Sequence, residues 1–247
     1  AVVRGGQAIY GLYVLLVFLA SIVPTWTLVK ISRSRKFSSR VTRAGLRLCC
    51  ALGFIPVRVS GSENIPRDEA CVLVANHTSY ADVPILMKAL GTDYRFVAKI
   101  EVLKLPFIGT FTRKLGHLWF ERANTRSRHD VADQVEALLR NGISVLIFPE
   151  GTFTASEGVR PFQLGAFKAA LSTGAPIVPV SVRRMRSFLR DGWWLPRPAR
   201  IEIAISQPMR AATKLRGQGT SASWEEMVRL RDAARAEIAR QSGEAIL

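Results

Sequence analysis

Residues 71–82 read CVLVANHTSYAD, and this stretch contains the kinds of element from which the fold is built. The apolar run at 71–75 is rich in branched side chains, which predicts a buried strand. The polar residues after it predict a turn. Asp82 favours the first turn of a helix, predicted over 82–90, because a negative charge is stabilised at the amino end of a helix dipole. A strand that leads through a turn into a helix is typical of α/β proteins.

The same alternation of strands and helices continues along the rest of the chain. Runs rich in β-branched and aromatic residues predict strands at 95–98, 117–120, 143–148, 177–182 and 201–205. Helical patterns lie at 106–115, 126–140 and 161–172, and a last helix is predicted to start near Ser223 with a capping box completed by Glu226. We therefore expect an α/β fold, with a mixed, largely parallel sheet flanked by helices on both faces.

The N-terminal quarter contains a long apolar run. Residues 8–29 have no charged side chain, close to the roughly 20 apolar residues that cross the hydrocarbon core of a bilayer. Pro24 predicts a kink or a break late in the run. The run can span a membrane, dip into one leaflet or form a long buried helix. Seven basic residues follow it closely, at Lys30, Arg33, Arg35, Lys36, Arg40, Arg43 and Arg47, and the first acidic residue of the chain is Glu63.

This basic cluster predicts how the N-terminal segment meets a membrane. Positive charge beside an apolar run favours the cytoplasmic face of the inner membrane for the remainder of the chain, and it attracts anionic lipids. Residues 41–52 have the pattern of an amphipathic helix, suited to a membrane interface or to packing on the domain. We expect a membrane-associated helical segment over residues 1–53 and an α/β domain over residues 54–247.

Composition narrows the classes of partner and cofactor. The 247 residues include 35 Lys and Arg against 19 Asp and Glu, a net charge of +16, which predicts a polyanionic partner. The arginines at 183–190 lack the interleaved aromatic residues of nucleic-acid readers, so lipid or donor phosphates are favoured over nucleic acid. Three cysteines, two of them adjacent, exclude a disulfide framework, and no Cys or His spacing predicts a metal site. We expect neither a metal nor a cofactor.

Two polar turns at predicted strand ends are the candidates for chemistry. His77 and Asp82 can meet if the histidine lies in the turn and the aspartate in the first helical turn; Asp82 would then hold one ring nitrogen as N–H and leave the other as a base. The strand at 143–146 ends in FPEGT, residues 148–152, with a second carboxylate at Glu150. Motifs for a serine nucleophile or a phosphate-binding glycine loop are absent from the sequence. His117, among bulky apolar residues, is expected to be structural.

Four segments in order resemble the four sequence blocks of the glycerophospholipid acyltransferases: NHTSYAD at 76–82, GHLWFER at 116–122, FPEGT at 148–152 and PIVPV at 176–180. These enzymes include the bacterial 1-acyl-glycerol-3-phosphate acyltransferases. The resemblance implies transfer of a fatty acyl group from acyl-CoA or acyl-carrier protein to the hydroxyl of a lysophospholipid. It implies that His77 is the general base and that Asp82 orients it. The acceptor would be bound by Arg122, Glu150, Gly151 and Thr152, with Lys99 as a second candidate ligand for its phosphate.

The sequence departs from the family pattern at two places. Phe153 and Thr154 stand where phosphatidate-forming members commonly have Arg and Ser, and Glu121 stands where Asp is usual. The acceptor therefore stays open between lysophosphatidic acid and another lysolipid, such as a lyso-ornithine lipid or lysophosphoethanolamine. The alternative from another class is a non-catalytic, basic membrane-binding scaffold, and the presence of both His77 and Asp82 argues against it.

Overall fold

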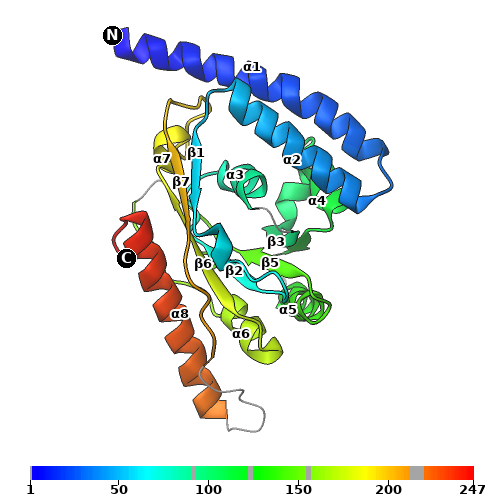
Figure 1. The fold of residues 1–247 in the computed structure, drawn as a ribbon, viewed down its shortest axis with the longest axis vertical. Helices are drawn as coiled ribbons and strands as arrows, with labels where there is room; N and C mark the ends of the chain where they lie inside the picture. The colour runs from blue at the N-terminus through cyan, green and yellow to red at the C-terminus, as the bar shows by residue number, and fades with distance from the viewer. Residues whose placement is uncertain (1, 91–92, 122–124, 154–156, 212–219) are drawn as a thin grey trace.

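The computed structural model describes residues 2–90, 93–121, 125–153, 157–211 and 220–247. Within these residues the strands form one seven-stranded sheet in the order β1-β7-β6-β2-β5-β3-β4 (Figure 1). Their bounds are β1 Val57–Ser60, β2 Val72–Ala75, β3 Tyr94–Lys99, β4 Leu118–Phe120, β5 Ser144–Ile147, β6 Ile177–Arg183 and β7 Ile201–Ile205.

The sheet is mixed and largely parallel, as the sequence predicts. β6 and β7 pair antiparallel. All the other neighbouring strands, including β1 and β7, pair parallel. All six predicted strands are present, with ends shifted by one or two residues at most. β1 was not predicted, because its four residues, VRVS, alternate polar and apolar side chains over too short a run to be distinguished from a loop.

Helices cover both faces of the sheet, which confirms the predicted layers (Figure 1). Two predicted helix starts are wrong. The last helix begins at Thr220, so Ser223 lies inside it and is not its N-cap, and the helix predicted over 161–172 begins at Gly165. The bounds are α1 Val2–Ile31, α2 Arg35–Leu52, α3 Asp82–Ala89, α4 Ile108–Leu115, α5 Thr125–Arg140, α6 Gly165–Thr173, α7 Met185–Phe188 and α8 Thr220–Ser242, with 3-10 turns η1 Ser62–Asn64 and η2 Ile100–Lys104.

Alternate residues of the central strand β2 point into two separate cores. Leu73 and Ala75 pack with side chains from α1, α2 and α3 on one face. Val72 and Val74 pack with side chains from α5, α6 and α8 on the other. All four residues are fully buried, as expected for a parallel strand covered by helices on both sides. This burial fixes the position of the turn after β2.

α1 and α2 form an antiparallel pair that lies against the domain (Figure 1). α1 is long and apolar enough to cross a membrane, with a mean hydropathy of 2.2 over its most apolar window, of which 22% is buried. Of the kink or break expected at Pro24, the break is wrong, since α1 continues through this residue. The Tyr10 hydroxyl donates to the Gly53 carbonyl at 3.0 Å, and Lys114 Nζ donates to the Ser32 carbonyl at 2.7 Å. The first contact joins α1 to the end of α2, and the second attaches the turn after α1 to α4 of the domain.

Candidate active site

The carboxyl ends of β2 and β5 form the centre of the candidate site. The two strands are neighbours, but β2 leads into α3 on one face of the sheet and β5 leads toward α6 on the other. In open α/β sheets a crevice forms where successive connections leave in opposite directions, and ligands bind there. The two polar turns singled out in the sequence, at 76–82 and 148–152, both lie at this point.

His77 and Asp82 are in direct contact, as the sequence predicts. Asp82 is the first residue of α3 and is fully buried, and its Oδ2 lies 2.8 Å from His77 Nδ1. The same oxygen accepts hydrogen bonds from the backbone N–H groups of Thr78 at 2.6 Å and Ser79 at 2.9 Å. Because Oδ2 accepts every bond it makes, Nδ1 carries the proton and Nε2 is the basic ring nitrogen. Among the described residues, Nε2 has no hydrogen-bond partner.

Two aromatic rings hold the imidazole of His77 on either side. Phe148 stacks on it with a centroid distance of 4.1 Å and an interplanar angle of 19°. Phe153 meets it edge-on at 4.6 Å and also contacts Tyr80, which is 70% exposed. Sequence reasoning missed both contacts, although Phe148 begins the FPEGT segment and Phe153 directly follows it. The two contacts restrict the orientation of the ring, and Phe148 covers one of its faces.

Glu150 lies beneath the histidine turn. Its Oε1 accepts a hydrogen bond from the His77 backbone N–H at 2.8 Å, and its Oε2 accepts one from the Arg160 backbone N–H at 3.0 Å. Burial raises the pKa of Glu150, and these two hydrogen bonds oppose that rise. Both carboxylate oxygens therefore connect backbone segments far apart in sequence. Gly151 comes next with φ at +70°, a left-handed conformation that favours glycine.

Asn76 fixes the other side of the turn, and sequence reasoning did not assign it a role. Its side chain donates to the Val182 carbonyl at 3.0 Å and accepts from the Val182 N–H at 2.8 Å. Asn76 is fully buried, so this paired contact replaces the hydrogen bonds that its amide would make with water. It joins the histidine turn to the end of β6.

Of the two predicted phosphate ligands, only Lys99 is among the described residues, and it lies near the β4 edge of the sheet. Lys99 is the last residue of β3, half-buried, and is in register with Phe120 at the end of β4. Arg122, two residues further on, lies outside the described residues. Thr152 is half-buried in the turn that contains Glu150. The structure thus brings His77, Asp82, Glu150, Gly151 and Thr152 together.

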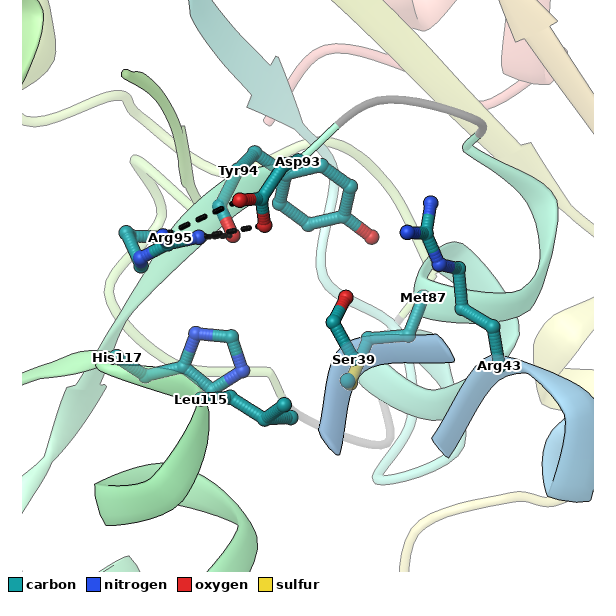
Figure 2. A pocket seen from close by; sticks show the side chains of 8 residues that line it. All are labelled: Ser39, Arg43, Met87, Asp93, Tyr94, Arg95, Leu115 and His117. Carbon is teal, nitrogen blue, oxygen red and sulfur yellow. Dashed lines mark hydrogen bonds and ion pairs between the residues drawn. The ribbon is translucent and has the colours of Figure 1, made fainter. Parts of the chain in front are cut away.

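A separate polar cavity of about 20 Å³ lies between α2 and β3, large enough for about one water molecule (Figure 2). In it, Arg95 is fully buried and pairs with Asp93 at 2.7 Å. His117 Nδ1 accepts from the Phe96 N–H at 3.2 Å, and burial lowers the pKa of His117 to about 3. A neutral, buried imidazole agrees with the structural role predicted for it. The lining residues are Ser39, Arg43, Met87, Asp93, Tyr94, Arg95, Leu115 and His117.

Comparison with solved structures supports the fold. The crystal structure of the 1-acyl-sn-glycerophosphate acyltransferase PlsC of Thermotoga maritima superposes with a TM-score of 0.74. The match covers 95% of this chain and 96% of that one at 24% identity. This similarity extends over the N-terminal helices as well as the sheet.

Sequence comparison identifies two informative relatives. The chain is 36% identical over 140 residues to a chloroplastic 1-acyl-sn-glycerol-3-phosphate acyltransferase of Brassica napus, covering 56% of this chain and 40% of that protein. It is 40% identical over 154 residues to the lyso-ornithine lipid O-acyltransferase of Pseudomonas aeruginosa, covering 62% of this chain and 55% of that protein. The matched segment thus spans about half the length of these relatives.

The part of the chain that contains the site also matches a protein family. The sequence model of the acyltransferase family matches residues 56–183. This segment begins just before β1 and ends with β6, so it includes both polar turns and the crevice between them. With more than half of its length matched, the chain belongs to the acyltransferase family.

Proposed function

We propose that this protein transfers a fatty acyl group from an acyl thioester to the free hydroxyl of a lysophospholipid. The observation that supports this most directly is the His77–Asp82 pair, with Nδ1 and Oδ2 at 2.8 Å, at the end of β2. A histidine whose Nδ1 is held by a buried carboxylate presents a basic Nε2 to a substrate. Family membership and the two acyltransferase relatives supply the reaction class.

The geometry supports direct transfer in one site. His77 Nε2 takes the proton from the acceptor hydroxyl while the hydroxyl oxygen attacks the thioester carbonyl carbon. Asp82 stabilises the imidazolium that forms. When the tetrahedral intermediate collapses, the carbon–sulfur bond breaks and His77 returns its proton to the thiolate. The products are an acylated lipid and free CoA or carrier thiol. No cofactor is needed for this sequence of steps.

Glu150 is proposed as a positioning residue, which changes its role from the one first expected. Glu150 is buried, and each of its oxygens accepts a hydrogen bond from a backbone N–H group. By accepting a hydrogen bond from the His77 backbone N–H, Glu150 positions the imidazole in the crevice. Lys99, at the end of β3, and Arg122, which belongs to the second of the four family-like sequence blocks, are proposed to hold the acceptor phosphate, because cations suit a phosphate group.

The acceptor is proposed to be lysophosphatidic acid or a lyso-ornithine lipid. Phe153, at a position where phosphatidate-forming enzymes commonly have Arg, contacts His77 and Tyr80 with its ring. This replaces a cation beside the base with an apolar surface. The lyso-ornithine lipid enzyme of Pseudomonas aeruginosa has higher identity to this chain than the plant enzyme does. Both observations favour keeping a phosphate-free acceptor, the lyso-ornithine lipid, beside lysophosphatidic acid.

We further propose that α1 and α2 bind the cytoplasmic face of the inner membrane through anionic lipids. α1 has a row of exposed apolar side chains, including Ile9, Leu12 and Leu16, and α2 adds Phe37, Leu48 and Leu52. Because the domain contacts α1 at Gly11 and contacts Ser32 just after its end, a helix perpendicular to the bilayer would have to detach from the domain. We therefore favour insertion along one leaflet.

The test is an acyl-transfer assay with purified protein. Each of acyl-CoA and acyl-carrier protein is combined with lysophosphatidic acid, lyso-ornithine lipid or lysophosphoethanolamine, and the product is identified by mass. An acyltransferase releases thiol in proportion to the acylated lipid that it forms. A membrane-binding scaffold, the alternative function, releases none with any pair. Thiol release without an acylated lipid would indicate hydrolysis and contradict the proposal.

A further inference from the structure

The loop at residues 189–198, between α7 and β7, exposes two adjacent tryptophans. Trp194 is 90% exposed and Trp193 is 56% exposed. Each indole is a large apolar surface, and a soluble domain gains nothing from leaving two of them in water at one place. Tryptophan has an apolar ring with one polar N–H, and for this reason it is enriched at the interface between lipid and water.

The loop is a fixed structure at its base. The Arg197 N–H donates to the Phe188 carbonyl at 2.8 Å and closes the loop. Phe188 is buried in the core, and Leu189 packs against it. The Arg197 guanidinium lies over the Trp193 ring, 4.1 Å from its centroid. The tryptophans are therefore held outward at the tip rather than left to collapse onto the surface.

This loop packs directly on α1. A Cβ atom added to Gly11 would lie 2.8 Å from Leu195 Cβ and 2.8 Å from the Pro196 carbonyl oxygen. Only a glycine on the helix permits this approach. The loop thus adjoins the part of α1 that also contains the exposed side chains of Ile9 and Leu12.

The charges around the loop match an anionic surface. Arg184, Arg190 and Arg200 are exposed, and among the described residues none of them forms an ion pair. Arg183 and Arg186, by contrast, pair with Glu202 and Glu244. Basic residues beside interfacial aromatics bind anionic headgroups while the rings enter the interface.

We propose that the tryptophan loop is a second membrane contact, with Trp193 and Trp194 inserted in the interface of an anionic bilayer beside α1. The inference rests on the proposed membrane binding of α1 and α2. Its consequence is orientation: α7 comes directly after the end of β6, which Asn76 ties to the histidine turn through Val182. Two separate contacts with the bilayer, α1 and the loop, fix the tilt of the domain and turn the crevice toward lipid.

The experiment compares the full-length protein with the double variant Trp193→Ala/Trp194→Ala. Trp224→Ala is the matched control, because Trp224 is also 56% exposed but lies in the first turns of α8, at the opposite end of the molecule from α1 (Figure 1). Binding is measured by co-sedimentation with phosphatidylcholine vesicles, with and without phosphatidylglycerol. Tryptophan quenching by lipids brominated on the acyl chain reports insertion depth.

We expect the double variant to bind anionic vesicles about tenfold or more weakly, given the area of two indoles, and to lose the part of the quenching that Trp193 and Trp194 contribute, while Trp26 on α1 still reports insertion of the helix. Trp224→Ala should match the parent in both measurements. Thiol release with a monomeric short-chain lysolipid should stay unchanged in the double variant, whereas turnover of bilayer-embedded acceptor should fall with binding. A triple variant, Arg184→Gln/Arg190→Gln/Arg200→Gln, should lose binding only to anionic vesicles, and mainly at low salt.

Several outcomes would overturn the proposal in distinguishable ways. If the parent protein binds no vesicles, the membrane proposal for α1 and α2 fails together with it. If the parent binds and the double variant binds and is quenched equally, only the loop proposal fails. Unchanged vesicle binding with slower turnover of acyl-carrier protein, but not of acyl-CoA, would show that the loop docks an acidic carrier protein instead.

Discussion

Replacing Asp82 with asparagine separates the negative charge of this residue from its role in orienting His77, because of the way its hydrogen bonds are arranged. Three donors converge on Oδ2: His77 Nδ1 and the backbone N–H groups of Thr78 and Ser79. The amide oxygen of an asparagine therefore has to occupy the Oδ2 position. Its NH₂ group then faces the Thr78 hydroxyl, now 3.3 Å from Oδ1, and this hydroxyl can accept as well as donate. Asp82→Asn keeps the orientation of His77 and removes only the negative charge.

The magnitude follows from the distance between the charges. With Nδ1 and Oδ2 at 2.8 Å, the centres of charge of the imidazolium and the carboxylate lie about 4 Å apart. At an effective dielectric constant of about 20, their attraction is about 4 kcal/mol. The positive charge develops only partly in the transition state, so the barrier rises by about 2–4 kcal/mol. This corresponds to a loss of roughly 30- to 1000-fold in kcat.

The assay measures kcat and stability in Asp82→Asn and Asp82→Ala in parallel. Alanine leaves the buried N–H groups of Thr78 and Ser79 without an acceptor, which costs about 1–3 kcal/mol of unfolding free energy for each. Asparagine should cost less than about 1 kcal/mol in denaturant unfolding. Near-normal turnover of a stable Asp82→Asn protein would show that Asp82 does not stabilise an imidazolium.

Other substitutions test the remaining assignments. His77→Ala should lower acyl transfer by about 10²–10⁴-fold with unfolding free energy little changed, and residual turnover above a tenth of the parent's would contradict the base assignment. Glu150→Gln places an NH₂ group against one of two backbone N–H donors. We expect kcat to fall about tenfold or more and the unfolding free energy to fall by about 1–3 kcal/mol. A change confined to the KM of the acceptor would instead indicate direct acceptor binding. Arg122→Ala should raise the KM of a phosphate-bearing acceptor far more than that of the donor, and equal effects would exclude an acceptor-specific role.

The chemistry of the site was predictable where it is local. His77 and Asp82 are five residues apart, and the turn and helix that join them were evident from the sequence between them. Most strand positions were equally evident, with 201–205 matching β7 to the residue. A strand or a short turn is specified by neighbouring side chains, through periodicity, turn residues and the preference of an aspartate for a helix start.

The surroundings of the imidazole were not predictable from residues nearby in the sequence. Glu150 contacts the His77 backbone across 73 residues, Asn76 contacts Val182 across 106, and Gly11 meets Leu195 from the opposite end of the chain. Each pair depends on which strands become adjacent, and that order minimises the exposed apolar area of the whole sheet. The short strand β1 shows the same dependence, because it is a strand through its pairing with β7.

The sequence by itself therefore determined most of the strands and helices, the mixed α/β class and the identity of the catalytic candidates. Only the tertiary structure decided that Glu150 accepts hydrogen bonds from two distant backbone segments, that Phe153 lies against the imidazole of His77, and that the tryptophan loop packs on α1 at Gly11. The physical reason is that periodicity and turn chemistry act over a few residues. Burial and hydrogen-bond pairing between distant segments exist only once the chain has closed around both cores.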